Sequence, residues 1–189
     1  DALIEENNDP VYDPEPIKEY MNKWDGAAFN EALQLTPDKS VLEIGVGTGR
    51  LALRVCGKCS SFTGIDISPK TIERAKENLR NFDHVKLLCG DFLNCEIPGR
   101  FDIIYSSLTF IHIKDKQSAI QKAAVLLNPG GSLVLSISKS QDTMLDFGDR
   151  RLTLYPDSPQ KIAALLVEAG LTIEKQFETE FAVVFAASK

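Results

Sequence analysis

Residues 41–50 read VLEIGVGTGR, an apolar run that ends in three alternating glycines. The run over 41–44 is typical of a parallel strand buried on both faces, and the glycines allow the backbone to pass close to a ligand. Residues 51–55 have helical spacing. The stretch therefore predicts a strand, a turn and a helix N-terminus at the edge of a sheet where α/β proteins bind nucleotides. A tight turn without a ligand is the alternative.

The glycine spacing argues against a dinucleotide-binding turn. Such a turn usually reads G-x-G-x-x-G, whereas Gly45, Gly47 and Gly49 read G-x-G-x-G. Glu43 lies inside the strand, where an unpaired charge is costly to bury, so it needs a cationic or hydrogen-bond-donating partner. A ligand with an ammonium or sulfonium group would supply one, and a pyrophosphate would be repelled. The alternative is a local partner, either a backbone N–H or Arg50.

Acids also follow the next two predicted strands. Residues 61–66 form a short strand pattern that ends at Asp66, where a carboxylate can accept hydrogen bonds from both ribose hydroxyls. Ile67 could cover one face of an adenine, and Ser68 caps the following helix. Residues 84–89 predict a third strand that leads to Asp91 and Phe92, which suit an exocyclic amine and a base.

Together these motifs resemble those of the class I S-adenosylmethionine-dependent methyltransferases, in particular the small-molecule branch with a seven-stranded Rossmann-like domain. Five motifs occur in the family's order between residues 40 and 138, including FDIIYSSL at 101–108 and LNPGG at 127–131. The resemblance implies that S-adenosyl-L-methionine is the cofactor and S-adenosyl-L-homocysteine the product. The resemblance and the patterns at the strand ends together give nine candidate cofactor-binding residues: Glu43, Gly45, Gly47, Gly49, Asp66, Ile67, Asp91, Phe92 and Ser106.

The rest of the chain predicts one α/β domain, a three-layer α/β/α sandwich. Helices are expected over 114–127 and from Pro159 to Gly170, a strand over 131–138, and a closing hairpin over 171–187. The resemblance implies sheet order 3-2-1-4-5-7-6 with strand 7 antiparallel. We expect residues 1–35 to form an arm and lid helix and residues 36–189 to form the methyltransferase domain.

Composition narrows the partners. The chain has 21 Lys and Arg against 27 Asp and Glu, a net charge of −6, which disfavours nucleic acid as a partner. Its opening residues are acidic, and no run approaches the roughly eighteen apolar residues of a membrane span, so we expect a soluble, cytoplasmic monomer or homodimer. The four cysteines, including Cys56 and Cys59, are interpreted as reduced thiols, with no metal bound.

Two segments outside the common core are expected to recognise the methyl acceptor, a small molecule. One is the arm over 12–35, where Tyr20 and Trp24 either line the pocket or simply pack on the sheet. The other is the polar segment 139–156, with Arg151 and Tyr155. His112 follows the fourth strand, where it could act as a general base or only hydrogen-bond the start of a helix.

Methyl transfer by in-line displacement needs alignment more than it needs a base. Two other functions stay open. One is a cofactor-binding regulatory or scaffold protein without catalysis, since the family has no universal catalytic residue. The other is a nicotinamide oxidoreductase, which the glycine spacing and Glu43 disfavour.

Overall fold

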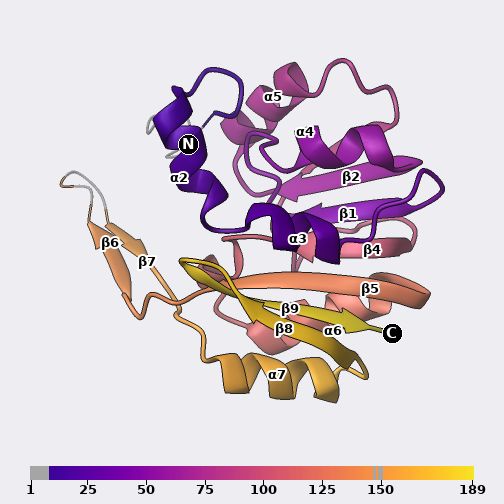
Figure 1. Ribbon diagram of the computed structural model, residues 1–189, viewed down its shortest axis with the longest axis vertical. Coiled ribbons are helices and arrows are strands. Elements are labelled where there is room, and N and C mark those ends of the chain that lie inside the picture. The colour runs from indigo at the N-terminus through magenta and orange to yellow at the C-terminus, as the bar shows by residue number, and fades with distance from the viewer. Residues whose placement is uncertain (1–8, 147, 149–150) are drawn as a thin grey trace.

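A seven-stranded sheet forms the centre of the computed structural model, which describes residues 9–146, 148 and 151–189 (Figure 1). The strand order is β3-β2-β1-β4-β5-β9-β8. The first five strands pair in parallel, and β9 runs antiparallel to both neighbours, which confirms the predicted order and the closing hairpin. The strands are β1 (Ser40–Ile44), β2 (Ser61–Asp66), β3 (Val85–Cys89), β4 (Phe101–Ser106), β5 (Leu127–Ser138), β8 (Thr172–Glu178) and β9 (Ala182–Ser188).

Helices cover both faces of this sheet. Buried side chains of α3, α4 and α5 form one core with β1 and β2, and those of α6 and α7 form a second core on the opposite face. Leu42 and Ile44 belong to the second core and Val41 to the first, as the alternation of a strand requires. The helices are α2 (Glu15–Asn22), α3 (Gly26–Ala32), α4 (Ala52–Val55), η1 (Cys56–Lys58), α5 (Pro69–Asn78), η2 (Phe110–His112), α6 (Lys116–Leu126) and α7 (Pro159–Glu168).

Side-chain caps fix where the long helices begin. Ser68 accepts a hydrogen bond from the Thr71 amide at 3.2 Å, and Ser158 accepts one from the Lys161 amide at 3.4 Å. Asp115 caps α6 in the same way. These caps therefore fix the residue at which each of the loops before α5, α6 and α7 ends and its helix begins.

The N-terminal arm crosses the sheet edge as two short helices, α2 and α3, rather than one lid helix. Trp24 and Tyr20 pack on Phe181 in the β8–β9 turn, with ring centroids 5.1 and 5.5 Å apart. The Thr179 hydroxyl donates to the Trp24 carbonyl at 2.8 Å. The arm is thereby held at the β8–β9 end of the sheet, which is the end opposite β3. Residues 1–8 of the predicted arm lie outside the described residues.

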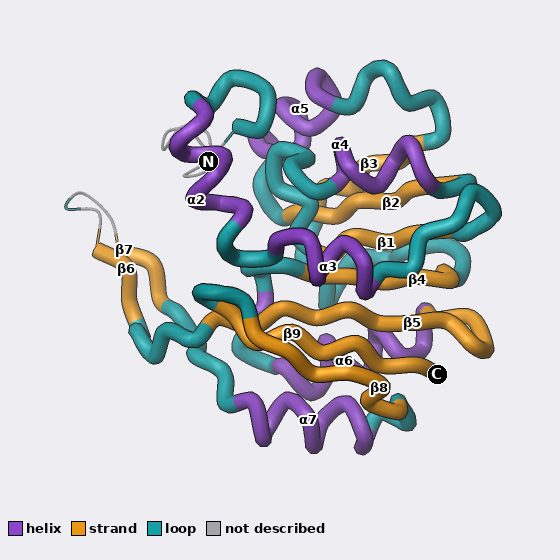
Figure 2. Tube along the Cα trace, in the orientation of Figure 1, coloured by secondary structure: helices purple, strands orange, loops and turns teal. Residues whose placement is uncertain are grey.

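Residues 139–156 contain a small hairpin where the sequence predicts a polar loop. Strands β6 (Met144–Asp146) and β7 (Arg151–Thr153) pair antiparallel and project from the body (Figure 2). Three-residue strands are too short for an alternating pattern to reveal them. Figure 1 shows this hairpin and α2 on the side toward which the β1 and β2 arrows point. No helix in the part of the chain described is long and apolar enough to cross a bilayer.

Candidate functional site

The glycine turn after β1 has the conformation that its sequence predicts. Gly45, Gly47 and Gly49 have φ values of +78°, +56° and +95°, a region that side chains disfavour. The Gly45 amide donates to the Ile65 carbonyl at 2.8 Å, which joins the turn to β2. A Cβ atom on Gly45 would lie 1.8 Å from Oγ1 of Thr109. Glycine is thus required at position 45 both by the backbone and by its neighbour.

Asp66 lies against this turn at the tip of β2. One carboxylate oxygen accepts from the Gly47 amide at 3.1 Å, and the other accepts from the Ser68 amide at 3.0 Å. These bonds orient the carboxylate and leave each oxygen a further lone pair for a ligand hydroxyl. Ile67 is 71% exposed, so its side chain is open to contact with a flat ring.

The third strand tip is a hydrogen-bonded turn. Asp91 accepts from the Leu93 amide at 3.1 Å and from the side-chain amide of Asn94. Phe92 packs into the core, only 6% exposed, and the Lys122 ammonium lies 5.2 Å from its ring centroid. Of the two predicted adenine-contacting side chains here, only Asp91 therefore has a partly exposed position.

Glu43 has the hydrogen-bond donor that its burial requires. That donor is a tyrosine hydroxyl, and the sequence analysis considered only a ligand, Arg50 or a backbone N–H. The Tyr105 hydroxyl donates to Oε2 of Glu43 at 2.8 Å, across the β1–β4 pair. Glu43 is 3% exposed, and burial raises its pKa to about 8. The Tyr105 hydrogen bond and Arg50 lower this pKa, while Asp25 and Asp66 raise it. Near neutral pH the carboxyl is thus largely protonated.

Arg50 pairs with Asp25, which the sequence analysis did not identify. Nη1 of Arg50 lies 3.1 Å from Oδ1 of Asp25, Nη2 contacts the other oxygen, and the Ser107 hydroxyl donates to that oxygen at 3.2 Å. Asp25 is fully buried and also caps α3. It joins the arm, the glycine turn and the end of β4. Ser106 beside it is buried, and its hydroxyl donates to the Ile44 carbonyl at 2.9 Å.

His112 ends η2, the turn after β4. Its side chain is exposed, yet neighbouring protein atoms desolvate the ring and lower its pKa. Lys116 lowers this pKa further, and Asp66 raises it. The charge on Asp66 therefore acts on His112 across the tips of β2 and β4, which brings the predicted ribose acid and the predicted base to one edge of the sheet.

The four residues predicted to recognise the acceptor occupy different positions. Tyr20 is half exposed on α2, and Trp24 packs on Phe181. Arg151 is exposed and pairs with Asp146 at 3.0 Å within the hairpin. The Tyr155 amide donates to the Ile111 carbonyl at 2.8 Å, which places Tyr155 directly beside η2. Tyr155 is thus the member of this set that the hydrogen bonds bring next to His112.

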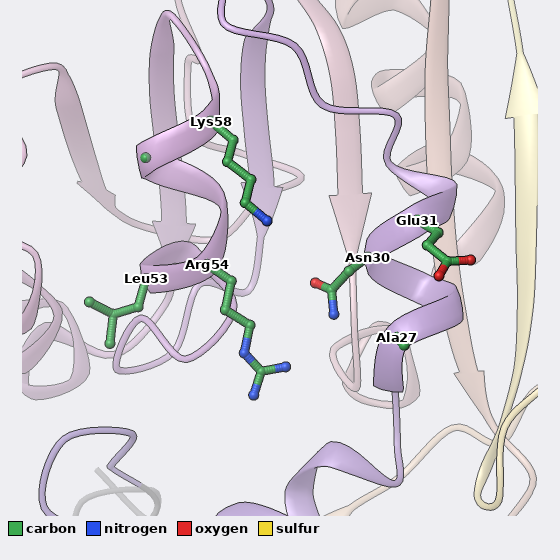
Figure 3. Close-up of a pocket in the computed structure, with 7 residues that line it drawn as sticks. Ala27, Asn30, Glu31, Leu53, Arg54 and Lys58 are labelled. Atoms are coloured by element: carbon green, nitrogen blue, oxygen red, sulfur yellow. The ribbon is translucent and has the colours of Figure 1, made fainter.

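Two hollows of the described surface lie between the N-terminal arm and the segment after the glycine turn. A shallow hollow of about 620 Å³ separates α3 from α4 and η1, and Arg54, Lys58 and Asn30 extend into it (Figure 3). A second hollow of about 200 Å³ shares Leu53 and Arg54 with the first and lies against the arm, including Lys18 and Met21 of α2, and against Arg50 of the glycine turn. Neither hollow is lined by any of the residues predicted to contact the cofactor.

The cysteines are free thiols. Burial raises the pKa of Cys56 to about 12, so this thiol stays protonated and weakly nucleophilic. Across the described ranges, no group of three or more His, Cys, Asp or Glu side chains is placed to hold a metal ion.

Comparison with known proteins gives a consistent result. Residues 41–131 match a family described as a methyltransferase domain. A malonyl-[acyl-carrier protein] O-methyltransferase of Priestia megaterium is 37% identical over 99 residues, which are 51% of this chain and 36% of that protein. An uncharacterized methyltransferase of Anoxybacillus flavithermus is 37% identical over 125 residues, 63% of this chain and 57% of that protein. The chain thus spans about a third to just over half of these relatives' lengths.

A solved structure has the same fold. N-methyltransferase NodS from Bradyrhizobium japonicum WM9, in complex with S-adenosyl-L-homocysteine, superposes with a TM-score of 0.66 at 21% identity, covering 93% of this chain and 86% of that one. The matched residues 41–131 include the glycine turn, Asp66, Asp91 and the end of β4. Residues 41–131 are thus similar to a methyltransferase domain, and the chain has the Rossmann-like fold of its solved methyltransferase neighbours.

Proposed function

We propose that this chain binds S-adenosyl-L-methionine at the carboxyl edge of its sheet and transfers the methyl group to a small-molecule nucleophile. The observation that carries the proposal is the contact between the glycine turn and Asp66. Three glycines in the left-handed region bring the backbone beside a carboxylate whose two oxygens are held by the Gly47 and Ser68 amides. This arrangement suits an adenosyl ligand, because a fixed carboxylate can accept from both ribose hydroxyls.

Each part of the ligand has candidate residues at this edge. Gly45, Gly47 and the backbone near Ser106 are proposed for the methionine part, with Gly49 shaping the turn. Asp66 is proposed for the ribose. Asp91, the backbone at Phe92 and the exposed side chain of Ile67 are proposed for the adenine. The structural neighbour NodS, whose structure contains S-adenosyl-L-homocysteine, supports a product of the same kind here.

Glu43 fits a cationic ligand in a specific way. Its carboxyl is largely protonated near neutral pH because it is buried. An ammonium group bound nearby would favour the ionised form, so Glu43 would gain charge when the ligand binds. A pyrophosphate would oppose that ionisation, which argues against a dinucleotide.

The proposed reaction is a displacement at the methyl carbon. A lone pair of the acceptor forms the new bond as the bond from the methyl carbon to the sulfonium sulfur breaks, and the sulfur keeps that electron pair. Any proton on the acceptor then leaves to a base or to water. His112 is the proposed base, because desolvation by neighbouring protein atoms and the charge on Lys116 lower the pKa of its ring, which favours the neutral form that can accept a proton.

The class of methyl acceptor is proposed from the net charge, the residues after β4 and the names of similar proteins. The net charge of −6 and the sequence SSLT at 106–109 disfavour nucleic acid as the acceptor. The relatives act on different atoms, since one is named an O-methyltransferase and one an N-methyltransferase. We therefore propose that the acceptor is a small molecule, and we assign no particular nucleophilic atom to it. Its candidate contacts are Tyr155, Arg151, Tyr20 and Trp24.

The test is release of S-adenosyl-L-homocysteine from S-adenosyl-L-methionine over a panel of metabolites with O, N, S and C nucleophiles. We expect turnover with at least one compound, and His112→Gln should lower the rate of turnover while leaving cofactor binding unchanged. Binding of the cofactor without turnover on the whole panel would favour the regulatory or scaffold function instead. Unchanged turnover in His112→Gln would remove the base role from His112.

A further inference from the structure

A buried lysine joins the turn after β4 to the segment after the β6–β7 hairpin. Lys116, the first residue of α6, is 6% exposed. Its ammonium donates to the Ile113 carbonyl at 2.6 Å, to the Tyr155 carbonyl at 3.0 Å and to the Phe110 carbonyl. It also lies 3.3 Å from Oδ1 of Asp157. One cation thus holds two segments that are about forty residues apart in the chain.

Helix stability does not explain this lysine. A cation at the first position of a helix opposes the helix dipole, so an acid would be the favourable choice for α6. Asp157 is 5% exposed, and its Oδ2 atom has no hydrogen-bond partner. Burial lowers the pKa of Lys116 and raises that of Asp157. Apolar side chains of similar volume would stabilise the fold at least as well as this pair.

The pair holds the segments that face the proposed reaction. Besides the bonds to Lys116, the Tyr155 amide donates to the Ile111 carbonyl at 2.8 Å, and the Leu154 amide donates to the Thr143 carbonyl at 2.8 Å at the base of the hairpin. At the other end of the same turn, Thr109 fills the space above Gly45. The position of η2 is therefore linked to the glycine turn on one side and to the hairpin on the other.

We propose that Lys116 and Asp157 are positioning residues for the acceptor side of the site. They fix η2 and residues 154–157 relative to the glycine turn, and so set where His112 and Tyr155 stand. This inference rests on the proposed methyl-transfer function. The pair acts through the backbone carbonyls that it binds and touches neither ligand.

The first test is Asp157→Asn, followed by amide hydrogen exchange. Loss of the charge pair should release residues 154–157 from η2, so the Tyr155 amide should exchange at least about tenfold faster relative to the β5 amides, which report global opening. Lys161→Met is the matched control, because it removes a nearby cation on α7 that influences Asp157 but binds none of these carbonyls. It should leave the Tyr155 amide unchanged.

The second readout is the pKa of His112, measured by NMR. The chain has two histidines, so a His84→Gln variant assigns the signal. Lys116 and Asp66 act on His112 across the site, and Lys114 and Asp115 follow it in the chain. Release of η2 hydrates the ring and raises its pKa toward the ordinary value. If η2 stays in place and Lys116 keeps its charge, loss of the Asp157 charge holds or lowers that pKa.

The inference requires both changes in Asp157→Asn. An unchanged Tyr155 amide, or a His112 pKa that holds or falls, overturns it. If Asp157→Asn does not fold, the double variant Lys116→Met, Asp157→Leu removes both charges, and the same exchange measurement applies.

Calorimetry with S-adenosyl-L-homocysteine separates a failure of this inference from a failure of the proposed function. Failure of the unaltered protein to bind contradicts the proposed function, whereas binding with a Kd kept within about twofold in Asp157→Asn is expected, because the pair lies outside the cofactor contacts.

Discussion

At the scale of single residues, Glu43 shows how far burial alone can predict a contact. Its place inside a buried strand requires a donor, and the structure supplies the Tyr105 hydroxyl at 2.8 Å. The sequence could not select Tyr105, because the register between β1 and β4 decides which residue stands opposite Glu43. The structure gives this hydrogen bond to Tyr105, which was neither of the two local partners considered, and Arg50 acts on Glu43 by lowering its pKa.

Glu43 should make stability fall as the pH rises. Its pKa is about 8 in the folded chain and near 4.5 when unfolded, so between these values the folded state holds a proton that the unfolded state has lost. Unfolding free energy should then drop by about 1.4 kcal/mol per pH unit from this group. In Glu43→Gln that slope should disappear. Urea denaturation at pH 5, 6, 7 and 8 measures it, and equal slopes in both proteins would show that Glu43 ionises normally.

Gly45 should be far less replaceable than a glycine with the same backbone angle elsewhere. Gly130 has φ of +74°, and a Cβ atom added to it would meet no atom within 4 Å, whereas a Cβ atom on Gly45 would collide with Thr109. Gly130→Ala should cost about 1–2 kcal/mol from backbone strain alone. Gly45→Ala should cost about 1–3 kcal/mol more from overpacking and should also weaken binding of S-adenosyl-L-homocysteine. Equal unfolding free energies for the two variants would contradict the role of the Thr109 contact.

At the scale of elements, the N-terminal arm is anchored to several parts of the fold. Asp9 at its start pairs with Arg74 of α5 at 3.4 Å. Asp25 in its middle pairs with Arg50 of the glycine turn, and Trp24 packs on Phe181 of the β8–β9 turn. The arm therefore crosses the edge where the cofactor is proposed to bind, and its middle anchor is part of the glycine motif itself.

Loss of Asp25 should loosen this arm more than the sheet. Asp25→Ala leaves the mostly buried Arg50 guanidinium without its partner, which should cost about 3 kcal/mol. Glu31→Ala, on the exposed side of the same helix, should change the unfolding free energy by less than about 0.5 kcal/mol. Urea denaturation gives both values. Hydrogen exchange should quicken first at residues 26–32, and equal acceleration in β4 would show that Asp25 is no local anchor.

The elements with strong local signals could be predicted, and those without them could not. Apolar runs marked the buried strands, and Ser68-Pro69 and Ser158-Pro159 marked the starts of α5 and α7. The β6–β7 hairpin could not be predicted, because its strands have only three residues each. The division of the arm into two helices at Asp25 and Gly26 could not be predicted either. It depends on the cap by Asp25 and on φ of +69° at Gly26, and hydrophobic periodicity shows neither.

At the scale of the whole molecule, the sheet order assembles the site from residues far apart in the sequence. The motifs at the tips of β1, β2 and β3 could be predicted because each is local in the chain. Asp25, Lys116 and Asp157 could not, because their roles depend on partners up to 82 residues away, such as Ser107 for Asp25. Such long-range ion pairs leave no periodic or motif signal in one sequence.

The overall charge gives a prediction of its own. With a net charge of −6, the chain should bind neither duplex nor single-stranded nucleic acid through phosphate contacts. Fluorescence anisotropy of a labelled 20-base-pair duplex at about 20 mM salt should stay flat up to micromolar protein, since counterion release favours binding most at low salt. Binding that weakens steeply with added salt would contradict the small-molecule acceptor class.

The central claim is that the glycine turn and Asp66 form a site for an adenosyl cofactor with a cationic methionine part. Calorimetric titration with S-adenosyl-L-homocysteine tests it most directly. We predict a single binding site, no heat with NAD, and at least about tenfold weaker binding in Asp66→Ala, because two charge-assisted hydrogen bonds are lost. Asp83→Ala, an exposed acid before β3, should bind as the unaltered protein does. Binding of NAD, with none of S-adenosyl-L-homocysteine, would contradict the claim.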